Sequence, residues 1–326
     1  MKKLAITMGD PGGVGPEIIV KVLSCAEIRD YCTPIVVGDK APIKEALTLL
    51  KLPIKLRIIA SPEESKPVRR GGSVELIDMG VVKKFRKGKP TAEGGRASVI
   101  YIKKAVELAL NKQVDGVVTA PISKQALKMA GFGWPGHTEM ISDLTHTKEC
   151  AMVLVGGPLR IILVTIHTSL KKVPSLITKD KILKSIRLAK RACDMLGIKA
   201  PRIAIAGLNP HAGEAGLFGE EEIKKIIPAV KEALKEGICV SGPYPPDTIF
   251  HKAYKSKIDI IVCMYHDQGL IPLKMVAFHE GVNLTVGLPI IRTSPDHGTA
   301  YDIAWKGIAN PSSMIEAIKL AAKLKL

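Results

Sequence analysis

The sequence predicts an α/β fold with two domains, each built on a largely parallel sheet. Short runs rich in β-branched residues alternate with amphipathic segments of helical period along the whole chain, which is typical of this class. The 326 residues exceed the usual length of one domain, so two hydrophobic cores with a cleft between them are expected. Hydrophobic residues make up 46% of the chain and aromatic residues only 4%. The cores should therefore consist of Ile, Val, Leu, Ala and Met.

The first half of the chain is predicted to form a strand, helix and strand pattern. A helix should begin near Pro16 and Glu17, because proline suits the first turn and an acidic residue suits the positive end of a helix. The segment 61–90 is rich in Pro, Gly, Lys and Arg, so we expect it to leave the sheet. The other expected elements are strands at 3–8, 34–37 and 115–122 and helices at about 43–50 and 91–112.

The second half continues the alternation after a turn-rich crossing that starts at Gly131. The expected strands lie at 151–155, 160–166, 202–207 and 258–264, with helices at about 179–196 and 220–235. Near Leu284 the chain turns back and ends in two short helices. We therefore predict a first domain of residues 1–132 plus 286–326 and a second domain of residues 133–285.

The charge of the chain raises a nucleic-acid alternative. A net charge of +17 would suit neutralisation of phosphates in DNA or RNA. The excess is mostly Lys spread over helical stretches such as 179–191, with no clustered Arg and no aromatic stacking platform. A solvated basic surface that attracts small anions explains it better. A non-enzymatic nucleic-acid-binding protein is therefore kept only as a remote alternative.

The cysteines and the amino terminus predict a cytoplasmic protein. The six cysteines show no CxxC spacing, so free thiols in a reducing compartment are expected. The first apolar stretch is cut at Gly9 to Gly13, before it reaches the length of a signal peptide. No run approaches the roughly 20 apolar residues that span a bilayer, so no membrane contact is expected.

Three apolar runs in the second half each end at a histidine, namely His167, His211 and His266. The carboxyl ends of parallel strands share one rim of a sheet, so these side chains can converge. Three protein ligands leave an open position for water or substrate, which is typical of a catalytic divalent metal. The alternative is that each histidine is only a polar residue at the start of a loop.

Two glycine-containing segments suggest anion sites. GDPGGVGPE (9–17) places glycines between a strand and a helix, which suits either an anion at the helix start or merely a tight turn. It is neither a GxGxxG fingerprint nor a P-loop. GHTE (136–139) places His137 and Thr138 at a helix start, where Thr138 can act as the cap.

Lys274, Asn283 and Arg292 lie close together in sequence near the expected return to the first domain. Two cations and an amide donor suit a phosphate or carboxylate ligand. Taken singly, each is more often an exposed surface residue.

Five long motifs together closely resemble the 4-hydroxythreonine-4-phosphate dehydrogenase family of pyridoxal phosphate biosynthesis. They are TMGDPGGVGPE (7–17), GHTE (136–139), GLNPHAGEAGLFG (207–219), MYHDQGL (264–270) and GLPIIRTSPDHGTAYDIA (287–304). The likeness covers essentially the whole chain. The segment 297–311 also resembles the nucleotide-contacting loop of isocitrate and isopropylmalate dehydrogenases. That superfamily implies two α/β/α domains with a central cleft and an NAD(P) site that is not a usual Rossmann site.

The resemblance implies a homodimer, with the active site in the interdomain cleft and the dimer contacts on the second domain. It implies that His167, His211 and His266 bind one divalent ion, such as Zn, Mg, Co or Mn. One ligand of each site would be His266 of the partner subunit.

The resemblance also assigns binding residues by matching positions. The substrate contacts would be His137, Thr138, Lys274, Asn283 and Arg292. The nucleotide, NAD or NADP, would meet His297, Gly298, Thr299, Ala300 and Asp302. One departure is Gly12, which stands where relatives commonly carry Ala, a change expected to be harmless.

The implied reaction is oxidation of 4-phosphooxy-L-threonine with β-decarboxylation to 3-amino-2-oxopropyl phosphate and CO2. Sibling branches with the same motifs act on threonate or erythronate 4-phosphate or on cyclic dihydrodiols, so the substrate stays open. Asp247 in PYPPDTIF is the candidate proton acceptor, and Asp267 is the candidate residue that orients His266. Both could equally be helix-capping or loop residues.

Overall fold

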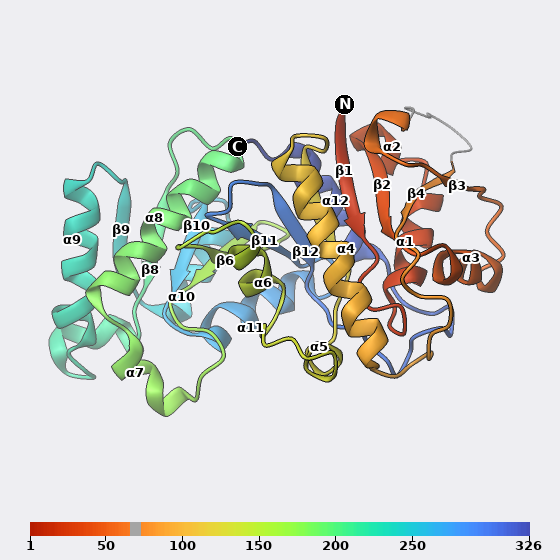
Figure 1. Ribbon diagram of the computed structural model, residues 1–326. Helices are drawn as coiled ribbons and strands as arrows, with labels where there is room; N and C mark the ends of the chain where they lie inside the picture. The colour runs from red at the N-terminus through yellow and green to blue at the C-terminus, as the bar shows by residue number, and fades with distance from the viewer. Residues whose placement is uncertain (66–72) are drawn as a thin grey trace. The chain divides into compact units, whose positions relative to one another are not determined.

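The computed structural model describes residues 1–65 and 73–326 (Figure 1). The chain divides into unit 1, residues 1–149, 288–324 and 326, and unit 2, residues 150–287 and 325. The expected first boundary at 132/133 lies earlier than this division. Helix α6 (His137–Leu144) contacts α4 (Ala92–Leu110), so the segment after residue 132 still belongs to unit 1.

In its described residues, unit 1 contains six strands in the order β3-β4-β2-β1-β5-β12, and every neighbouring pair is parallel. The strands β1, β2 and β5 are mostly apolar and buried, as in a sheet covered by helices on both faces. The bounds are β1 (Lys2–Thr7), β2 (Cys32–Gly38), β3 (Leu56–Ile58), β4 (Val74–Asp78), β5 (Gly116–Thr119) and β12 (Arg292–Pro295).

The long helix α4 contacts β1, β2 and β5 (Figure 1). It begins after Thr91, whose side chain accepts a hydrogen bond from Gly94 N at 3.0 Å, a typical N-cap. One terminal helix, α12 (Ser312–Lys323), forms where two were expected, because residues 301–307 make turns instead. The remaining helices are α1 (Gly15–Ser24), α2 (Ile28–Tyr31), α3 (Lys40–Leu49), η1 (Pro62–Glu64) and α5 (Lys124–Met129).

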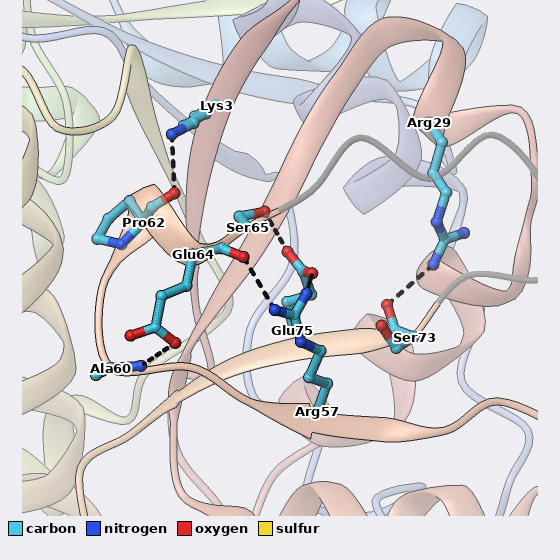
Figure 2. Close-up of polar contacts among 9 residues, drawn as sticks. All are labelled: Lys3, Arg29, Arg57, Ala60, Pro62, Glu64, Ser65, Ser73 and Glu75. Atoms are coloured by element: carbon cyan, nitrogen blue, oxygen red, sulfur yellow. Dashed lines mark hydrogen bonds and ion pairs between the residues drawn. The ribbon is translucent and has the colours of Figure 1, made fainter.

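The prediction that segment 61–90 leaves the sheet is wrong for β4, which pairs with both β3 and β2. Its Val74 and Leu76 are fully buried, and its Glu75 is only 5% exposed. Arg57 Nη1 lies 2.7 Å from Glu75 Oε1, and Ser65 also bonds Glu75 (Figure 2). The pairing of this carboxylate allows an acidic residue to sit inside a sheet. Part of the segment, 66–72, lies outside the described residues.

Unit 2 has the strand order β11-β6-β7-β10-β8-β9. The pairs β7 with β10, β10 with β8, and β8 with β9 are parallel, whereas β6 is antiparallel to both β7 and β11. The strands β9 and β11 were not predicted. The bounds are β6 (Ala151–Gly156), β7 (Leu159–Leu163), β8 (Ile203–Ala206), β9 (Val240–Tyr244), β10 (Ile260–Cys263) and β11 (Val282–Val286).

Helix α8 (Lys179–Met195) covers strands of unit 2 and contacts β6, β7, β8 and β10 (Figure 1). Its charged face is exposed and its Ile182, Ile186 and Ala189 are buried, which agrees with a solvated basic surface. The other helices are η2 (Leu170–Lys172), α7 (Val173–Leu176), η3 (Pro210–Gly216), η4 (Glu222–Ile226), α9 (Ile227–Lys235), α10 (Pro246–Tyr254) and α11 (His266–Ala277).

The cores are built as the composition predicts, mainly from Ile, Val, Leu and Ala. Tyr101 and Trp305 are their buried aromatic residues in the part of the chain that the structure describes. The cysteines are free thiols; Cys32, Cys193 and Cys263 are buried, while Cys239 is exposed. None of the described helices is both long enough and apolar enough to span a bilayer.

Candidate active site

Three of the histidines of unit 2, the predicted metal ligands, follow three neighbouring parallel strands. His167 follows β7, His266 begins the helix after β10, and His211 follows β8. Because β10 is parallel to both of its neighbours, the carboxyl ends of the three strands lie at one rim. We call His167, His211, His266 and Asp267 the strand-end site.

Within the strand-end site, His167 and His266 lie next to each other. Their ring centroids are 5.6 Å apart at an interplanar angle of 44°. Val164 N donates to Cys263 O at 2.9 Å, and Thr165 Oγ1 donates to Met264 O at 2.7 Å, so the two strand ends are held together. Both rings line a surface cavity of about 480 Å³ formed by residues 166–170, Val173 and 265–267.

Asp267 lies in position to orient His266. Its Oδ1 is 2.6 Å from His266 Nδ1, and its side chain is 70% exposed. A carboxylate on Nδ1 fixes the tautomer that leaves Nε2 as the ligating nitrogen, a common arrangement around protein-bound metals. The predicted role of Asp267 therefore has a suitable geometry.

His211 has a carboxylate partner of its own. Its Nδ1 is 3.0 Å from Glu214 Oε2, and its side chain is 64% exposed. His211 and Glu214 both have left-handed backbone conformations, with φ of 52° and 41°. Such a run of positive φ values is costly for residues other than glycine and persists only where the surroundings fix it.

No group of three His, Cys, Asp or Glu side chains is arranged to hold a metal ion within residues 1–65 and 73–326. The chain thus brings two of the three predicted ligands together and leaves His211 outside the pair. The donor chemistry still fits a divalent metal, because His211 and His266 each have Nδ1 against a carboxylate and Nε2 as the remaining nitrogen.

Two buried residues that position the strand-end site were not predicted. Glu222 is 2% exposed and accepts hydrogen bonds from Leu208 N at 2.7 Å and Asn209 N at 2.8 Å, just before His211. Gln268 accepts from Met264 N and donates to Gly207 O, which joins the ends of β10 and β8. In the sequence, the glutamine directly after the His-Asp pair was the feature from which the role of Gln268 could have been predicted.

The remaining candidates of unit 2 lie on nearby elements of the fold. Asp247 is exposed in the first turn of α10, a helix that contacts the η3 segment carrying His211. Lys274 is half-buried on α11, with its Nζ 5.5 Å from the centroid of the Phe278 ring, and Asn283 is half-buried on β11.

A second group, in unit 1, surrounds Arg292. Its side chain is 2% exposed, and Nη2 donates to Thr119 Oγ1 at 2.7 Å. Burial lowers the pKa of Arg292 to about 10, with Glu139 opposing the shift, so the guanidinium still carries its charge at neutral pH. The predicted anion-binding arginine is therefore a buried cation. We call His137, Thr138 and Arg292 the arginine site.

His137 contributes a neutral imidazole to the arginine site. Burial lowers its pKa well below 6.5, the nearby Arg292 lowers it further, and the Ala120 carbonyl opposes both. Its Nε2 is buried and has no hydrogen-bond partner among the described residues, so it can bind a polar ligand atom. The expected capping role of Thr138 is wrong, because Gly136 is the N-cap of α6 and no side chain caps it.

The predicted nucleotide residues lie in a partly exposed loop of unit 1, residues 297–302, which we call the nucleotide segment. His297, Gly298 and Asp302 are exposed, and a Cβ on Gly298 would meet no atom within 4 Å. A hydrogen bond to the glycine-rich turn holds the segment in place, because Tyr301 Oη donates to Asp10 Oδ2 at 2.7 Å. Its exposed backbone is thus open to a ligand.

The structure decides between the two interpretations of GDPGGVGPE. Gly12 N donates to Asp10 Oδ1, Gly13 N to Asp10 O, and Val14 N to Thr299 O, at 2.8 to 3.0 Å. These amides are already used, so the tight turn is favoured over the anion site. A Cβ on Gly13 would lie 3.0 Å from Thr299 O, because the turn packs against the nucleotide segment. Burial raises the pKa of Asp10, while its bonds to Tyr301 and Gly12 oppose the shift.

Comparisons with known proteins agree along the full chain. The 4-hydroxythreonine-4-phosphate dehydrogenase of Desulforapulum autotrophicum is 47% identical over 322 residues, 98% of this chain and 94% of that protein. The D-threonate 4-phosphate dehydrogenase of Cupriavidus necator is 45% identical, covering 98% of this chain and 96% of that protein. The crystal structure of the Klebsiella pneumoniae 4-hydroxythreonine-4-phosphate dehydrogenase superposes with a TM-score of 0.92 at 43% identity, covering 99% of this chain and 97% of that one.

These matches confirm the predicted α/β fold and define a dehydrogenase. The family model described as "Pyridoxal phosphate biosynthetic protein PdxA" matches residues 30–321. The chain belongs to this family. The nucleic-acid alternative has no support from any of these proteins.

Proposed function

We propose that this protein oxidises 4-phosphooxy-L-threonine with NAD or NADP and decarboxylates the product to 3-amino-2-oxopropyl phosphate and CO2. The observation that carries the proposal is the arginine site, where a buried guanidinium lies beside a neutral imidazole with an unsatisfied Nε2. A buried, permanently charged fork suits a phosphate, and the imidazole suits a polar group of the same ligand. The 47% identity with a dehydrogenase of that name supports the choice of substrate.

Each residue then has a defined task. Arg292 and Lys274 bind the phosphate, while His137, Thr138 and Asn283 hold the polar groups of the substrate. Asp247 is exposed and carries no ion pair in the described chain, so it can accept the alcohol proton. The carboxylate of the substrate leaves as CO2 after the β-hydroxyl has been oxidised to a ketone. One site therefore accounts for both the oxidation and the decarboxylation.

We propose that His167, His211 and His266 hold one divalent ion, such as Zn, Mg, Co or Mn. When bound, such an ion supplies a Lewis acid for the secondary alcohol of the substrate. Asp267 and Glu214 hold Nδ1 of two of these imidazoles and so present their Nε2 atoms.

We also propose a homodimer that shares each metal between subunits, with His266 of the partner subunit as the ligand the resemblance implies. Two observations support sharing. His211 lies outside the His167 and His266 pair of its own chain, and α11 exposes Ile271 at 60% and Met275 at 83%, with Phe278 at its end at 70%. Such a cluster of exposed apolar side chains marks an interaction surface.

Mixed dimers test which ligands come from one chain. Combining His211→Ala with His266→Ala subunits should restore roughly a quarter of the wild-type activity, because half of the dimers are mixed and each holds one intact site. No recovery would contradict sharing. Combining His167→Ala with His266→Ala subunits then identifies which histidine the partner subunit supplies. Activity returns in this mixture only if His167 and His266 of one site come from different subunits.

We propose that His297, Gly298, Thr299, Ala300 and Asp302 contact the nucleotide. The nicotinamide ring is the hydride acceptor of the reaction. The exposed backbone of the nucleotide segment and its support by Asp10 keep that surface fixed before the nucleotide arrives.

The substrate is tested with a panel of 4-phosphooxy-L-threonine, D-threonate 4-phosphate and D-erythronate 4-phosphate, each with NAD and NADP. The highest kcat/KM with phosphooxythreonine would support the proposal. The threonate compound is the second candidate, because a dehydrogenase of that name is 45% identical. A clear preference for it would replace the proposed substrate and leave the oxidation chemistry unchanged.

A further inference from the structure

The segment KKFRKGK (83–89), which we call the basic loop, has no role in the sites described above. It carries five cations and no carboxylate within seven residues, all on exposed side chains. Lys87 forms an ion pair with Glu45. No ion pair of Lys83, Lys84, Arg86 or Lys89 is found in the described parts of the chain.

The basic loop is packed against the glycine-rich turn. Gly88 N donates to Gly12 O at 2.8 Å. A Cβ on Gly12 would lie 2.5 Å from Arg86 O and 2.8 Å from Lys89 O. An alanine at position 12 would therefore displace the loop in this chain. Glycine at position 12 is the residue that permits the close approach.

The basic loop also touches the residues that follow the nucleotide segment. The Phe85 and Trp305 rings are 4.9 Å apart, and Lys87 Nζ lies 5.0 Å from the centroid of the Trp305 ring. A Cβ on Gly88 would lie 3.0 Å from Tyr301 O. Trp305 is itself fixed, since its Nε1 donates to Pro11 O at 3.1 Å. The loop is thus held beside residues 301–305 by contacts that leave most of its cations in solvent.

We propose that the basic loop binds phosphate groups of the nicotinamide dinucleotide, with Lys83, Lys84 and Arg86 as the residues that determine affinity. The inference rests on the proposed nucleotide segment. A dinucleotide lying along residues 297–302 places its phosphates within a Debye length, about 10 Å, of a loop that contacts Tyr301. Cations without acidic partners are not neutralised in advance, so they attract an anionic ligand at no cost in broken ion pairs.

The test measures the Kd of NAD and of NADP for the enzyme without substrate, by fluorescence or calorimetry at low ionic strength. The variant combines Lys83→Gln, Lys84→Gln and Arg86→Gln and keeps Lys87, which packs on Trp305. The matched control, Lys55→Gln with Lys103→Gln and Lys112→Gln, removes the same charge from exposed positions elsewhere in unit 1. Thermal midpoints of both variants should match the wild type, because all six side chains are exposed.

We expect the loop variant to raise the Kd by about tenfold, with a weaker effect at high salt, and the control to leave it within about twofold. A larger increase for NADP than for NAD would assign the loop to the 2′-phosphate, and equal increases would assign it to the pyrophosphate. Both results support the proposal. Unchanged Kd values in the loop variant would overturn it. If the wild type binds neither nucleotide, the proposed cofactor fails instead, so the two failures are distinguishable.

Discussion

The arginine site of unit 1 and the strand-end site of unit 2 differ most in their exposure to water. Arg292 is 2% exposed, and the Nε2 of His137 is buried, whereas the His211 side chain is 64% exposed. The arginine site is therefore organised before any ligand arrives. The strand-end site presents imidazoles on a surface, and two of the three lie together in one chain.

The two sites therefore gain their binding free energy for a ligand in different ways. In the buried site, desolvation lowers the pKa of both His137 and Arg292, so the site carries an electrostatic strain that an anionic ligand relieves. In the exposed strand-end site, carboxylates on Nδ1 orient two of the imidazoles. The binding free energy there has to come from the bonds between the imidazoles and the metal. Substitutions in the arginine site should thus affect stability and substrate binding together, whereas those in the strand-end site should affect metal binding and turnover but not stability.

The largest effect is expected for His211→Ala. Loss of one of three metal ligands should reduce metal-dependent turnover by about 10³-fold or more, as the loss of a principal catalytic group does. The thermal midpoint should not change, because the side chain is exposed. His251→Ala, another exposed histidine of unit 2, is the control. Undiminished turnover in His211→Ala would remove this residue from the mechanism.

The second-largest effect is expected for Arg292→Ala, on the KM of the substrate. Removing a buried cation from a phosphate should raise the substrate KM by about 100-fold, since such pairs are worth about 2–5 kcal/mol. The free energy of unfolding should also fall, because Thr119 loses its partner and a cavity remains. The exposed Arg202, paired with Asp259, provides the control as Arg202→Ala. An unchanged KM would contradict the phosphate contact.

Asp267→Asn should have a smaller effect. An amide cannot fix the His266 tautomer as a carboxylate does, so metal affinity should fall by about 10- to 100-fold. Because the Asp267 side chain is 70% exposed, urea denaturation should give the wild-type free energy of unfolding. Glu280→Gln removes an exposed carboxylate outside the site and serves as the control. Equal metal affinity in the two variants would leave Asp267 without a role in metal binding.

The smallest effect is a pH dependence of stability from His137. Its pKa in the folded state lies well below the unfolded value of about 6.5, so below that pH the unfolded state binds a proton that the folded state does not. The stabilisation is present above pH 6.5 and declines as the pH falls toward the folded pKa, by at most about 1.4 kcal/mol per pH unit.

Urea unfolding of the wild type and His137→Asn between pH 7 and pH 5 measures this term. The variant should lose stability less steeply over that range. Parallel curves would mean that His137 titrates normally and that the arginine site is more hydrated than its burial indicates.

Local patterns in the sequence predicted the elements with strong periodicity, such as α4 and α8, and the parallel strands that precede the histidines. The strand β4 was missed because its short alternation lies inside a segment rich in Pro, Gly and basic residues. Helix α11 was missed because Gly269 and Pro272 interrupt its helical signal.

The parts of the candidate site whose chemistry follows from residue type alone could be predicted from the sequence. The parts whose geometry depends on contacts between segments far apart in the chain could not. His167 and His266 meet because β7 and β10 pair, and a parallel pairing of strands about 100 residues apart in sequence leaves no local signal. The choice between an anion site and a turn at residues 9–17 depended on Thr299, which accepts the Val14 amide from the far end of the chain. The left-handed backbone of His211 is likewise fixed by Glu222 and its neighbours rather than by periodicity.

The most direct test of the account is the absorption spectrum of the protein with Co²⁺ bound, measured for the wild type and for each single His→Ala variant at positions 167, 211 and 266. The account predicts that one ion binds per chain with nitrogen ligands, and that each substitution weakens its binding and alters the spectrum. Wild-type affinity and spectrum in all three variants would contradict the claim that these imidazoles share one metal ion.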